Sequence, residues 1–472
     1  MKIYIFLFLS LLAIFQPIAA QEHKTKAVLA ENKTPFIHKD TTIRSLQDFW
    51  GKSRLQGHIR NYFMATVNEG DLKDYWTNAL GEGIQLTTPE WYGLQVGMKS
   101  IFTYKTFSAD LNEVDTIVGK SAKWEKELYD VNRPEVGKDI DRLEELFIRF
   151  NFSKSFVQYG KMDINTRPLF LRRDGRMMPF VYQGLWSEWG ELKDQKVSLG
   201  WIDGVSPRGT TEWFSMDEVI GLNNNGTEPN GEKAHYHETA QTKGIAVIGY
   251  ENDQIEGWKW QMWNYHFHHL TNIIWLQSDY KKGDWNLGLQ YVHQNAAAFQ
   301  EELDYADRYI QPDEKANVLN LLMGYKLGKW QLSAAYFHAF DSGRFLFPRE
   351  LGREDFYVSQ PRSWIDGFGD TDVWMLRFKT KELMNKHLNL DVRLSRTITA
   401  GLDTFEFNKY NVPSFYQLTA NTTYQFTNEL KGLELQFLYI YKITEKSVEL
   451  KPATVFYGTN YHHFNLIANI NF

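Results

Sequence analysis

Lysine and arginine residues recur between apolar residues in several segments of this chain. Arg149, for example, lies between Ile148 and Phe150. In an extended strand neighbouring side chains point to opposite faces, so each such cation lies on the face opposite to its apolar neighbours. The same pattern selects Arg60, Lys99, Arg149, Arg377, Lys379, Arg393 and Lys442. A row of such side chains in water would attract anions, including carboxylates.

Acidic residues Glu145, Asp391 and Glu434 occur in the same phase as these cations. If the strands cross a bilayer, the charges must face a lumen, because a lysine or arginine on the lipid face at mid-membrane costs ~2–4 kcal/mol. Two interpretations remain open for each residue. The cations form an electropositive path for anions, or they mostly pair with acids as in any water-filled lumen.

The last ten residues indicate which kind of strand carries these charges. From His463 to Phe472 apolar and polar residues alternate, with Ile467 as the large apolar residue on the polar side. About ten alternating residues is the length that a tilted strand needs to cross a bilayer. We therefore expect a transmembrane antiparallel β-barrel, with the carboxy-terminal Phe472 as its assembly signal.

The amino-terminal segment predicts export. A short basic start, an apolar run from Ile3 to Ile18 and the small residues Ala19-Ala20 are typical of a signal peptide, which we place at residues 1–20. Residues 21–53 are polar and predict a periplasmic extension, with a short helix near Ile43 to Trp50 as one option. The chain has no cysteine, which excludes disulfides, thiolate metal sites and a cysteine-linked lipid anchor.

Residues 54–472 predict one barrel domain. Four hairpins in the carboxy-terminal half have alternating strands and short polar turns, such as Lys281 to Asp284, whereas connections such as Asn295 to Ala316 and Phe340 to Gly369 are long. This asymmetry is typical of short periplasmic turns and long extracellular loops, and we expect about 18 strands, or about 16 as the fallback, since bacterial barrels have even numbers. One further strand lies near Phe180 to Trp189 or near Thr211 to Val219.

Composition agrees with a membrane barrel. Aromatic residues make up 15% of the chain, and the mean hydropathy is -0.46. Tryptophan and tyrosine are enriched at both membrane interfaces of such barrels, while their lumens are polar. A secreted carbohydrate-binding protein is the alternative that also uses many aromatic residues.

The segment from Gly160 to Gly184 resembles the inward loop of OprD-type outer-membrane porins. Such porins have a strand ending in Gly-Arg, then a proline, then an Asp-x-Arg-x-x-Pro-x-x-Phe-x-Gly pattern. This chain departs from the pattern at the phenylalanine, where it has Phe180-Val181-Tyr182. The matching residues here are Gly160, Lys161, Pro168, Asp174, Arg176, Pro179 and Gly184, with Lys161 in place of the arginine. Weaker similarities occur at Gly57 to Phe63 and Gly93 to Gly97.

This resemblance implies a barrel with a narrow channel that an inward-folded loop near residues 163–195 partly closes. It implies a basic ladder of Arg60, Arg149, Lys161, Arg377 and Arg393, to which strand phase adds Lys99, and constriction residues Arg167, Arg172, Arg173, Asp174 and Arg176. The implied function is passive, partly selective diffusion of small polar solutes such as carboxylates, amino acids or short peptides. Arg172 and Arg173 could instead pair with Asp174 and hold the loop in shape.

The expected location is the outer membrane of a Gram-negative bacterium, with outer-membrane lipid, lipopolysaccharide and the barrel-assembly machinery as partners. We expect a monomer, with a trimer as the alternative, and no nucleic-acid partner, cofactor or bound metal. His235, His237, His266, His268 and His269 fix no third metal ligand, and no catalytic set indicates an enzyme. A barrel whose long loops bind a surface partner is the competing function.

Overall fold

The computed structural model describes residues 43–133, 140–164, 168–171, 176–223, 225–237, 239–381, 383–384, 387–445 and 450–472. The chain divides into two units, Met1–Phe36 and Ile37–Phe472, and every described residue belongs to the second. The predicted signal peptide 1–20 and residues 21–42 of the predicted extension lie outside the described residues. Among the described residues, no helix is both long enough and apolar enough to span a membrane.

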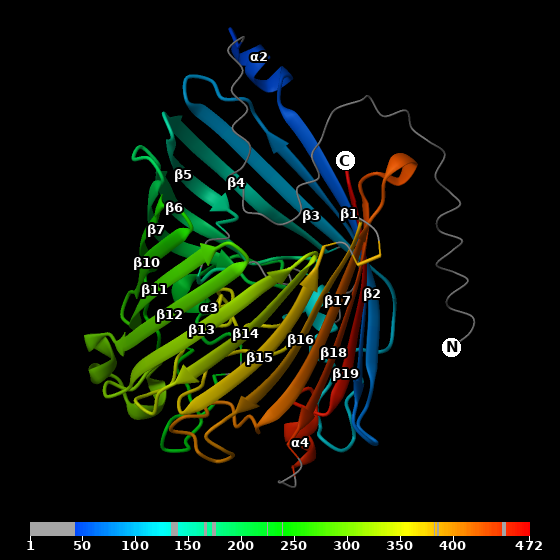
Figure 1. The fold of residues 1–472 in the computed structure, drawn as a ribbon, viewed down its shortest axis with the longest axis vertical. Coiled ribbons are helices and arrows are strands. Elements are labelled where there is room, and N and C mark those ends of the chain that lie inside the picture. The colour runs from blue at the N-terminus through cyan, green and yellow to red at the C-terminus, as the bar shows by residue number, and fades with distance from the viewer. Residues whose placement is uncertain are drawn as a thin grey trace. The chain divides into compact units, whose positions relative to one another are not determined.

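Nineteen strands form one antiparallel sheet (Figure 1). Their bounds in the first half are β1 Arg54–Asn68, β2 Tyr75–Thr87, β3 Leu94–Ser108, β4 Ile140–Phe152, β5 Ser155–Met162, β6 Val181–Trp189, β7 Gln195–Ser206, β8 Phe214–Ser215, β9 Ile245–Ile255 and β10 Trp258–Phe267. Those in the second half are β11 Thr271–Lys282, β12 Trp285–Ala296, β13 Lys315–Leu327, β14 Trp330–Ala339, β15 Thr371–Thr380, β16 Leu388–Ile398, β17 Phe415–Gln425, β18 Leu433–Thr444 and β19 Tyr461–Asn471.

Eighteen of these strands close into a ring, as expected. The two-residue strand β8 pairs with β7 alone, and β7 pairs directly with β9, so β8 stands outside the ring. The first and last strands close it in register from His58↔Asn471 to Asn68↔Tyr461. Phe472 extends this closure, because its backbone N–H donates to Gly57 O at 3.0 Å and its carbonyl accepts from Gly57 N at 2.9 Å.

The strands form because their side chains alternate between an apolar outer face and a mixed inner face. On β4, Leu146, Ile148 and Phe150 are exposed, whereas Phe147 and Arg149 between them are buried. The last strand follows the predicted phase, since His463, Asn465 and Ile467 are all buried. Exposed apolar residues on one face of the strands match the lipid-facing band of a membrane barrel.

The connections differ at the two ends of the barrel. At one end, which we call the short-turn rim, tight turns such as residues 283–284 and 328–329 join the strands, and Phe472 ends there. The opposite long-loop rim carries connections such as residues 109–139, 163–180, 207–244 and 340–370, although residues 69–74 and 268–270 are short. In outer-membrane barrels the long loops face the outside.

Two differences from the sequence prediction concern boundaries. The segment Val181–Trp189 is strand β6, so the predicted loop 163–195 ends at residue 180, whereas Thr211 to Val219 holds β8 and the short helix α3, Met216–Val219. Alternation in the sequence predicts a strand only from Gly83 to Thr88, whereas β2 starts earlier, at Tyr75, because small inner-face residues such as Ala79 and Gly81 hide its alternation.

Three short helices lie between strands or before them. Helix α2, Leu46–Gly51, precedes β1 and begins at Ser45, whose hydroxyl accepts from Asp48 N at 3.0 Å. It overlaps the helix expected near Ile43 to Trp50. Helix α4, Pro452–Val455, lies between β18 and β19.

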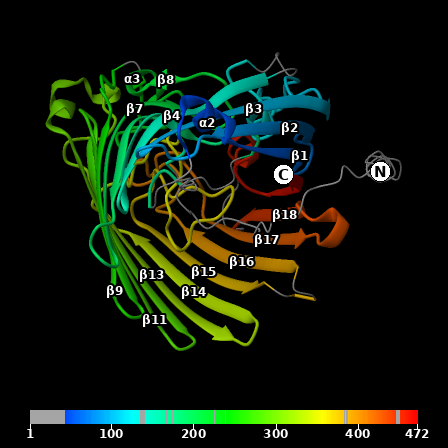
Figure 2. The same ribbon diagram turned by 90° about the horizontal axis from the view of Figure 1, so that it is seen from above.

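Folded loops fill much of the lumen (Figure 2). The loop 340–370 packs Phe345, Phe347 and Phe356 against inward aromatic residues such as Trp275 in one buried apolar cluster. A second cluster joins Trp124 of the loop 109–139 to Ile467 and neighbouring inner-face residues. The barrel interior is therefore largely a packed core, and water-filled space is confined to what these loops leave open.

Candidate functional site: a cationic pocket inside the barrel

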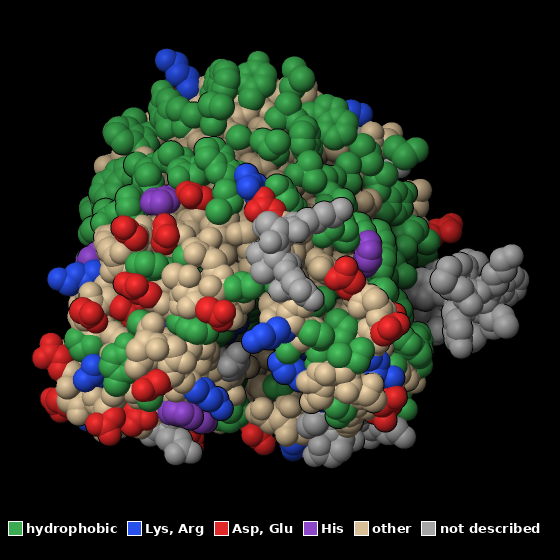
Figure 3. Space-filling view, turned by 90° about the horizontal axis from the view of Figure 1, so that it is seen from below, with side chains coloured by type: hydrophobic (Ala, Val, Ile, Leu, Met, Phe, Trp, Pro, Cys, Tyr) green, Lys and Arg blue, Asp and Glu red, His purple; other side chains and the backbone are tan. Residues whose placement is uncertain are grey.

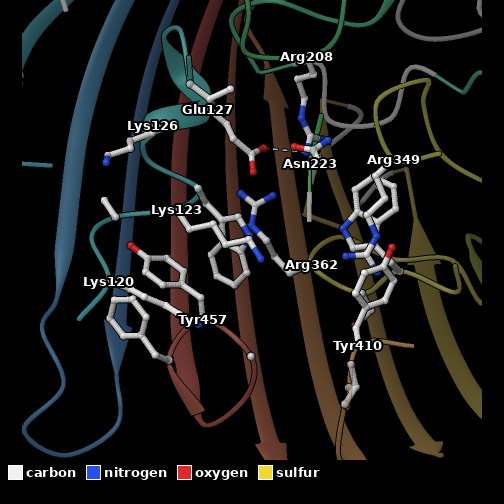
Figure 4. A pocket seen from close by; sticks show the side chains of 18 of the residues that line it. Lys120, Lys123, Lys126, Glu127, Arg208, Asn223, Arg349, Arg362, Tyr410 and Tyr457 are labelled. Carbon is white, nitrogen blue, oxygen red and sulfur yellow. Dashed lines mark hydrogen bonds and ion pairs between the residues drawn. The ribbon is translucent and has the colours of Figure 1, made fainter. Parts of the chain in front are cut away.

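One cavity of about 550 Å³ lies among the inward loops, and we call it the cationic pocket. Its walls come from the connections between β3 and β4, β5 and β6, β7 and β9, β14 and β15, β16 and β17, and β18 and β19, together with residues of β17 and β18. Nine lysine and arginine residues line it: Lys120, Lys123, Lys126, Arg176, Arg208, Arg349, Arg353, Arg362 and Lys442. Glu127 is the one carboxylate among the described residues that line it (Figure 4).

The long-loop end of the molecule is hollowed near its middle, and lysine and arginine side chains lie beside the hollow (Figure 3). Acidic side chains are spread over other parts of the same face. A cleft lined by one sign of charge concentrates oppositely charged solutes. Basic side chains therefore lie at the edge of the hollow that leads to the interior.

Lys123 lies at the centre of the cation group. Its side chain reaches into the pocket, where desolvation by the surrounding protein and the charges of Arg349, Lys120 and Arg176 lower its pKa to about 8. Burial and like charges both disfavour a protonated amine. The ammonium of Lys123 is consequently held where its own neighbours repel it.

Two arginines of the loop 340–370 are held rigidly at the pocket wall. Arg349 Nε donates to Asp366 Oδ2 at 2.8 Å, and its guanidinium lies 3.6 Å from the centre of the Tyr410 ring. Arg353 lies 4.4 Å from the centre of the Trp364 ring. Stacking on aromatic faces holds a guanidinium in place without removing its charge.

Arg362 belongs to a hydrogen-bonded relay that crosses from the pocket to the β1–β19 seam. Its Nη2 lies 2.7 Å from His463 Nε2, and His463 Nδ1 lies 2.9 Å from Thr66 Oγ1. Because a guanidinium can only donate, His463 Nε2 accepts and Nδ1 carries the hydrogen. The Thr66 hydroxyl then donates to Glu125 Oε1 at 2.5 Å.

Glu125 ends this relay in the loop 109–139. Its second oxygen accepts from the Tyr457 hydroxyl at 2.5 Å. Burial raises the pKa of Glu125 above its usual range, while the hydrogen bonds from Thr66 and Tyr457 oppose that rise. The relay therefore ties three loops to the strands that close the barrel.

Arg176 is the one predicted constriction residue among the described residues, and it lies at the pocket. Its guanidinium pairs with Glu127, and Arg208 pairs with the same carboxylate at 2.8 Å. The Arg176 carbonyl accepts from the Arg60 guanidinium, which also donates to Asn469 Oδ1 at 2.8 Å. Arg167, Arg172, Arg173 and Asp174 lie outside the described residues, so their role stays a prediction.

The described part of the predicted inward loop is deeply buried. Leu169, Phe170, Arg176, Met178 and Phe180 are all at most 3% exposed. This burial is consistent with an inward fold of that loop.

The predicted ladder residues Arg377 and Arg393 meet at one acid. Arg377 Nη2 and Arg393 Nη2 donate to Asp391 Oδ2 at 2.6 and 2.8 Å. Arg393 Nη1 also donates to Ser359 O at 3.0 Å, in the loop 340–370. Arg393 and Arg60 thus both face the lumen, and each guanidinium donates a hydrogen bond to a backbone carbonyl of an inward loop.

Lys99 and Arg149 face inward on neighbouring strands but do not line the cationic pocket. Lys99 Nζ lies 2.6 Å from Glu144 Oε1, and both side chains are buried. Arg149 Nε donates to Gln158 Oε1 at 2.7 Å, and its guanidinium lies 3.8 Å from the centre of the Phe156 ring. These contacts are those of residues that stabilise the barrel wall.

Lys161 lies on the opposite face from the other expected ladder residues. It is paired with the exposed Leu146, whereas its neighbour Met162 is buried inside the barrel. The Lys161 ammonium lies 4.3 Å from the centre of the Trp213 ring. The prediction placed Lys161 by motif similarity, while the period-two phase of β5 decides its face.

Basic residues continue to the short-turn rim. A second cavity, of about 560 Å³, is lined there by Lys281, Lys326, Lys329, Lys379 and Lys381, which belong to the hairpins between β11 and β16. Arg377 and Lys379 lie two residues apart on β15 and so share its inner face. Cations therefore occur from the cationic pocket, past Arg393 and Arg377, to the opposite mouth.

Sequence reasoning missed most of the pocket. Lys120, Lys123, Arg349, Arg353 and Arg362 all lie in connections that the alternation pattern identified only as loops. A signal was present, since Arg349 and Arg353 occur in a dense run of charged and apolar residues from Phe345 to Phe356. Such a mixture is unusual for a solvent-exposed loop and indicates packing against other residues.

The histidines considered as metal ligands remain apart from this site. His268 and His269 stack with ring centres 3.8 Å apart, and His237 Nδ1 lies 2.8 Å from Ile220 O. Within the described residues, no group of three or more histidine, aspartate or glutamate side chains could hold a metal ion.

No protein-family model matches the chain, and no curated protein sequence matches it. Solved structures do match. OpdK of Pseudomonas aeruginosa, determined with vanillate, is 16% identical and has a TM-score of 0.64, with 90% of this chain and 99% of that chain covered. OccAB4 of Acinetobacter baumannii is 13% identical with a TM-score of 0.66, covering 90% of this chain and 99% of that one.

A third structure, OccK9 (OpdG) of Pseudomonas aeruginosa, is 14% identical with a TM-score of 0.65, covering 90% of this chain and all of that chain. These neighbours are outer-membrane porins of the OprD/Occ type. At such identities the similarity establishes the fold. The expected closed barrel of 18 strands, and the expected resemblance to OprD-type porins, are confirmed at the level of the fold.

Proposed function

We propose that this chain is an outer-membrane porin through which small water-soluble solutes diffuse, with a preference for carboxylates and other anions. The observation that carries this proposal is the cationic pocket, where nine basic residues face a cavity with a single lining carboxylate among the described residues. Rings of lysine and arginine give anion selectivity to pores, because they replace part of the hydration of the passing ion.

The arrangement along the barrel supports the same function. A solute leaving the cationic pocket would next meet Arg60, Arg377 and Arg393 on the inner faces of β1, β15 and β16. It would then reach the lysines of the second cavity at the short-turn rim. A series of binding sites that have the same sign of charge and moderate affinity lets an ion enter without trapping it.

The competing function, recognition of a surface partner by long loops, has less support. The loop 340–370 buries Arg344, Glu350, Arg353, Arg362 and Asp366 inside the barrel. Charged side chains that are buried in interior contacts are not available to bind a macromolecule outside the barrel.

Reversal potentials in planar bilayers under a KCl gradient test the proposal. We expect the purified barrel to conduct and to prefer chloride over potassium. Arg349→Gln should reduce that preference, because its guanidinium faces the pocket, whereas Lys193→Gln in the turn between β6 and β7 should leave it unchanged. Preference for potassium, or a barrel without measurable conductance, would rule the proposal out.

A further inference from the structure

Three lysines that line the cationic pocket, Lys120, Lys123 and Lys442, differ from its arginines in their pairing with carboxylates. Arg176 and Arg208 share Glu127, Arg349 pairs with Asp366, and the Arg353 guanidinium lies 3.7 Å from Glu354. In the described part of the chain, no ion pair joins Lys120, Lys123 or Lys442 to a carboxylate. Lys442 is 5% exposed, with its ammonium 3.8 Å from the centre of the Phe415 ring.

These cations come from separate elements that surround one space. Lys120 and Lys123 lie on the loop 109–139, Arg349 lies on the loop 340–370, and Lys442 lies on β18. In Figure 4, Lys123 and Arg349 lie on different sides of the pocket. A solute between them can therefore be contacted from more than one direction at once.

The lowered pKa of Lys123 has the same physical origin. It reflects desolvation by the surrounding protein and the nearby charges of Arg349, Lys120 and Arg176, and no carboxylate among the described residues forms an ion pair with Lys123. A bound anion would relieve this repulsion. A singly charged anion would satisfy one cation and leave the others opposed, whereas an anion with several separated charges could satisfy cations on both walls.

We propose that the cationic pocket is a binding site for small organic anions that carry two or more negative charges, held by Lys120 and Lys123 of the loop 109–139, Arg349 of the loop 340–370 and Lys442 of β18. This inference rests on the proposed porin function and specifies its substrate class. The cavity volume of about 550 Å³ admits a compact polycarboxylate with its remaining water.

Interruption of single-channel current at moderate salt provides the test, with citrate as the multivalent probe and acetate as the monovalent one. We expect citrate to interrupt the current at concentrations about tenfold or more below those of acetate, since clustered cations favour clustered negative charge. Lys123→Gln should remove most of that difference. Lys193→Gln, at a side chain that is 89% exposed in the turn between β6 and β7, is the matched control.

The outcomes separate this inference from the porin function. A barrel that prefers chloride in KCl but responds equally to citrate and acetate would overturn the multivalent site and leave the porin function intact. Preference for potassium would overturn the porin function itself. Lys123 is exposed to the pocket, so its substitution leaves the packed core unchanged, and heat-modifiability on gels verifies the folded barrel.

The pH dependence gives an independent readout. Lys123 has a pKa lowered to about 8, so it is charged below that pH and loses its charge as the pH rises through it. The groups that face it are Lys120, Arg176, Arg349 and Lys442. We expect citrate affinity to fall more steeply above pH 8 in the unmodified chain than in Lys123→Arg, which keeps its charge. An identical decline in both proteins would contradict the assigned role of Lys123.

Discussion

Arg362 shows how a single side chain serves both the pocket and the scaffold. Its backbone has a positive φ of 62°, a conformation that few non-glycine residues adopt. The guanidinium reaches His463 Nε2 at 2.7 Å and lies 5.1 Å from the centre of the Trp124 ring. A loop residue in an uncommon conformation is held there by its contacts, so His463 helps to position a cation of the pocket.

At this scale we predict that His463→Gln destabilises the barrel. The substitution disturbs a buried acceptor for Arg362 and a donor to Thr66, and leaving such groups unsatisfied costs ~1–3 kcal/mol. Denaturant titration in detergent should show a lower unfolding midpoint, and bilayer recordings should show noisier current. The matched control is His462→Gln, since His462 is exposed on the opposite face of β19 and contacts Tyr439.

If both histidine variants unfold at the same denaturant concentration as the unmodified chain, the relay does not stabilise the structure. Equal losses in both variants would instead indicate a general sensitivity of β19. A loss confined to His463 would support the relay from Arg362 to Glu125.

The loop 340–370 is the element that does most to shape the interior. It crosses the lumen through contacts with several strands, including Gln360 Nε2 to Ser395 Oγ at 2.6 Å and Tyr357 OH to Asp279 Oδ1 at 2.7 Å. Its base is closed by the pairing of Phe345 with Phe368, where Phe345 N donates to Phe368 O at 2.9 Å. The loop therefore behaves as a folded insert with adjacent ends.

Because these ends are adjacent, a short glycine turn can take the place of residues 347–366 and connect them. We expect the conductance of this variant to rise about twofold or more. The insert occupies much of the lumen, so its excision should enlarge the cross-section through which ions pass. Anion preference should fall at the same time, since Arg349, Arg353 and Arg362 leave with the insert.

A milder variant, Trp364→Ala, tests the same prediction without shortening the chain, in case the excision variant misfolds. Trp364 lines the pocket and stacks with Arg353, so its loss should widen the pocket and raise conductance less than the excision does. Unchanged conductance in a folded excision variant would show that the loop lies outside the conducting path.

At the scale of the whole molecule, closure of the ring depends on the pairing of β1 with β19. The Phe472 ring lies over Gly57, where an added Cβ would come within 2.5 Å of the Phe472 Cζ atom. Phe472 thus contributes both backbone hydrogen bonds and side-chain packing at the seam, while its side chain remains 74% exposed. Its role as the assembly signal stays a prediction, as do a monomeric state and contacts with lipopolysaccharide.

We predict that Phe472→Ala lowers the amount of folded barrel recovered from outer membranes several-fold. The seam would lose its terminal aromatic contact, and the assembly machinery would lose the residue that we expect it to recognise. Phe378→Ala, at an exposed outer-face residue of β15, is the control with the same loss of aromatic area. Equal recovery of both variants, measured by heat-modifiability and membrane fractionation, would exclude a special role for Phe472.

The sequence alone determined the ring of strands and the face on which strand residues lie. Alternation in β4 and β19 places Arg149 and His463 inside, because period-two geometry and the cost of charge in lipid act locally on each strand. The same local rule explains why Lys161, assigned by motif similarity, lies on the other face. The length of strands with small inner residues, such as β2, is underestimated from the sequence, because the residues on their two faces differ little in hydropathy.

Only the tertiary structure decided what fills the ring. Whether residues 340–370 extend outward or pack inside depends on contacts with strands far away in sequence, such as those of Tyr357 with Asp279 and Arg362 with His463. No local period encodes such contacts, since burial of a loop is set by the surfaces that surround it. The cationic pocket is therefore a product of loop packing, whereas the barrel around it was already apparent in the alternating strands.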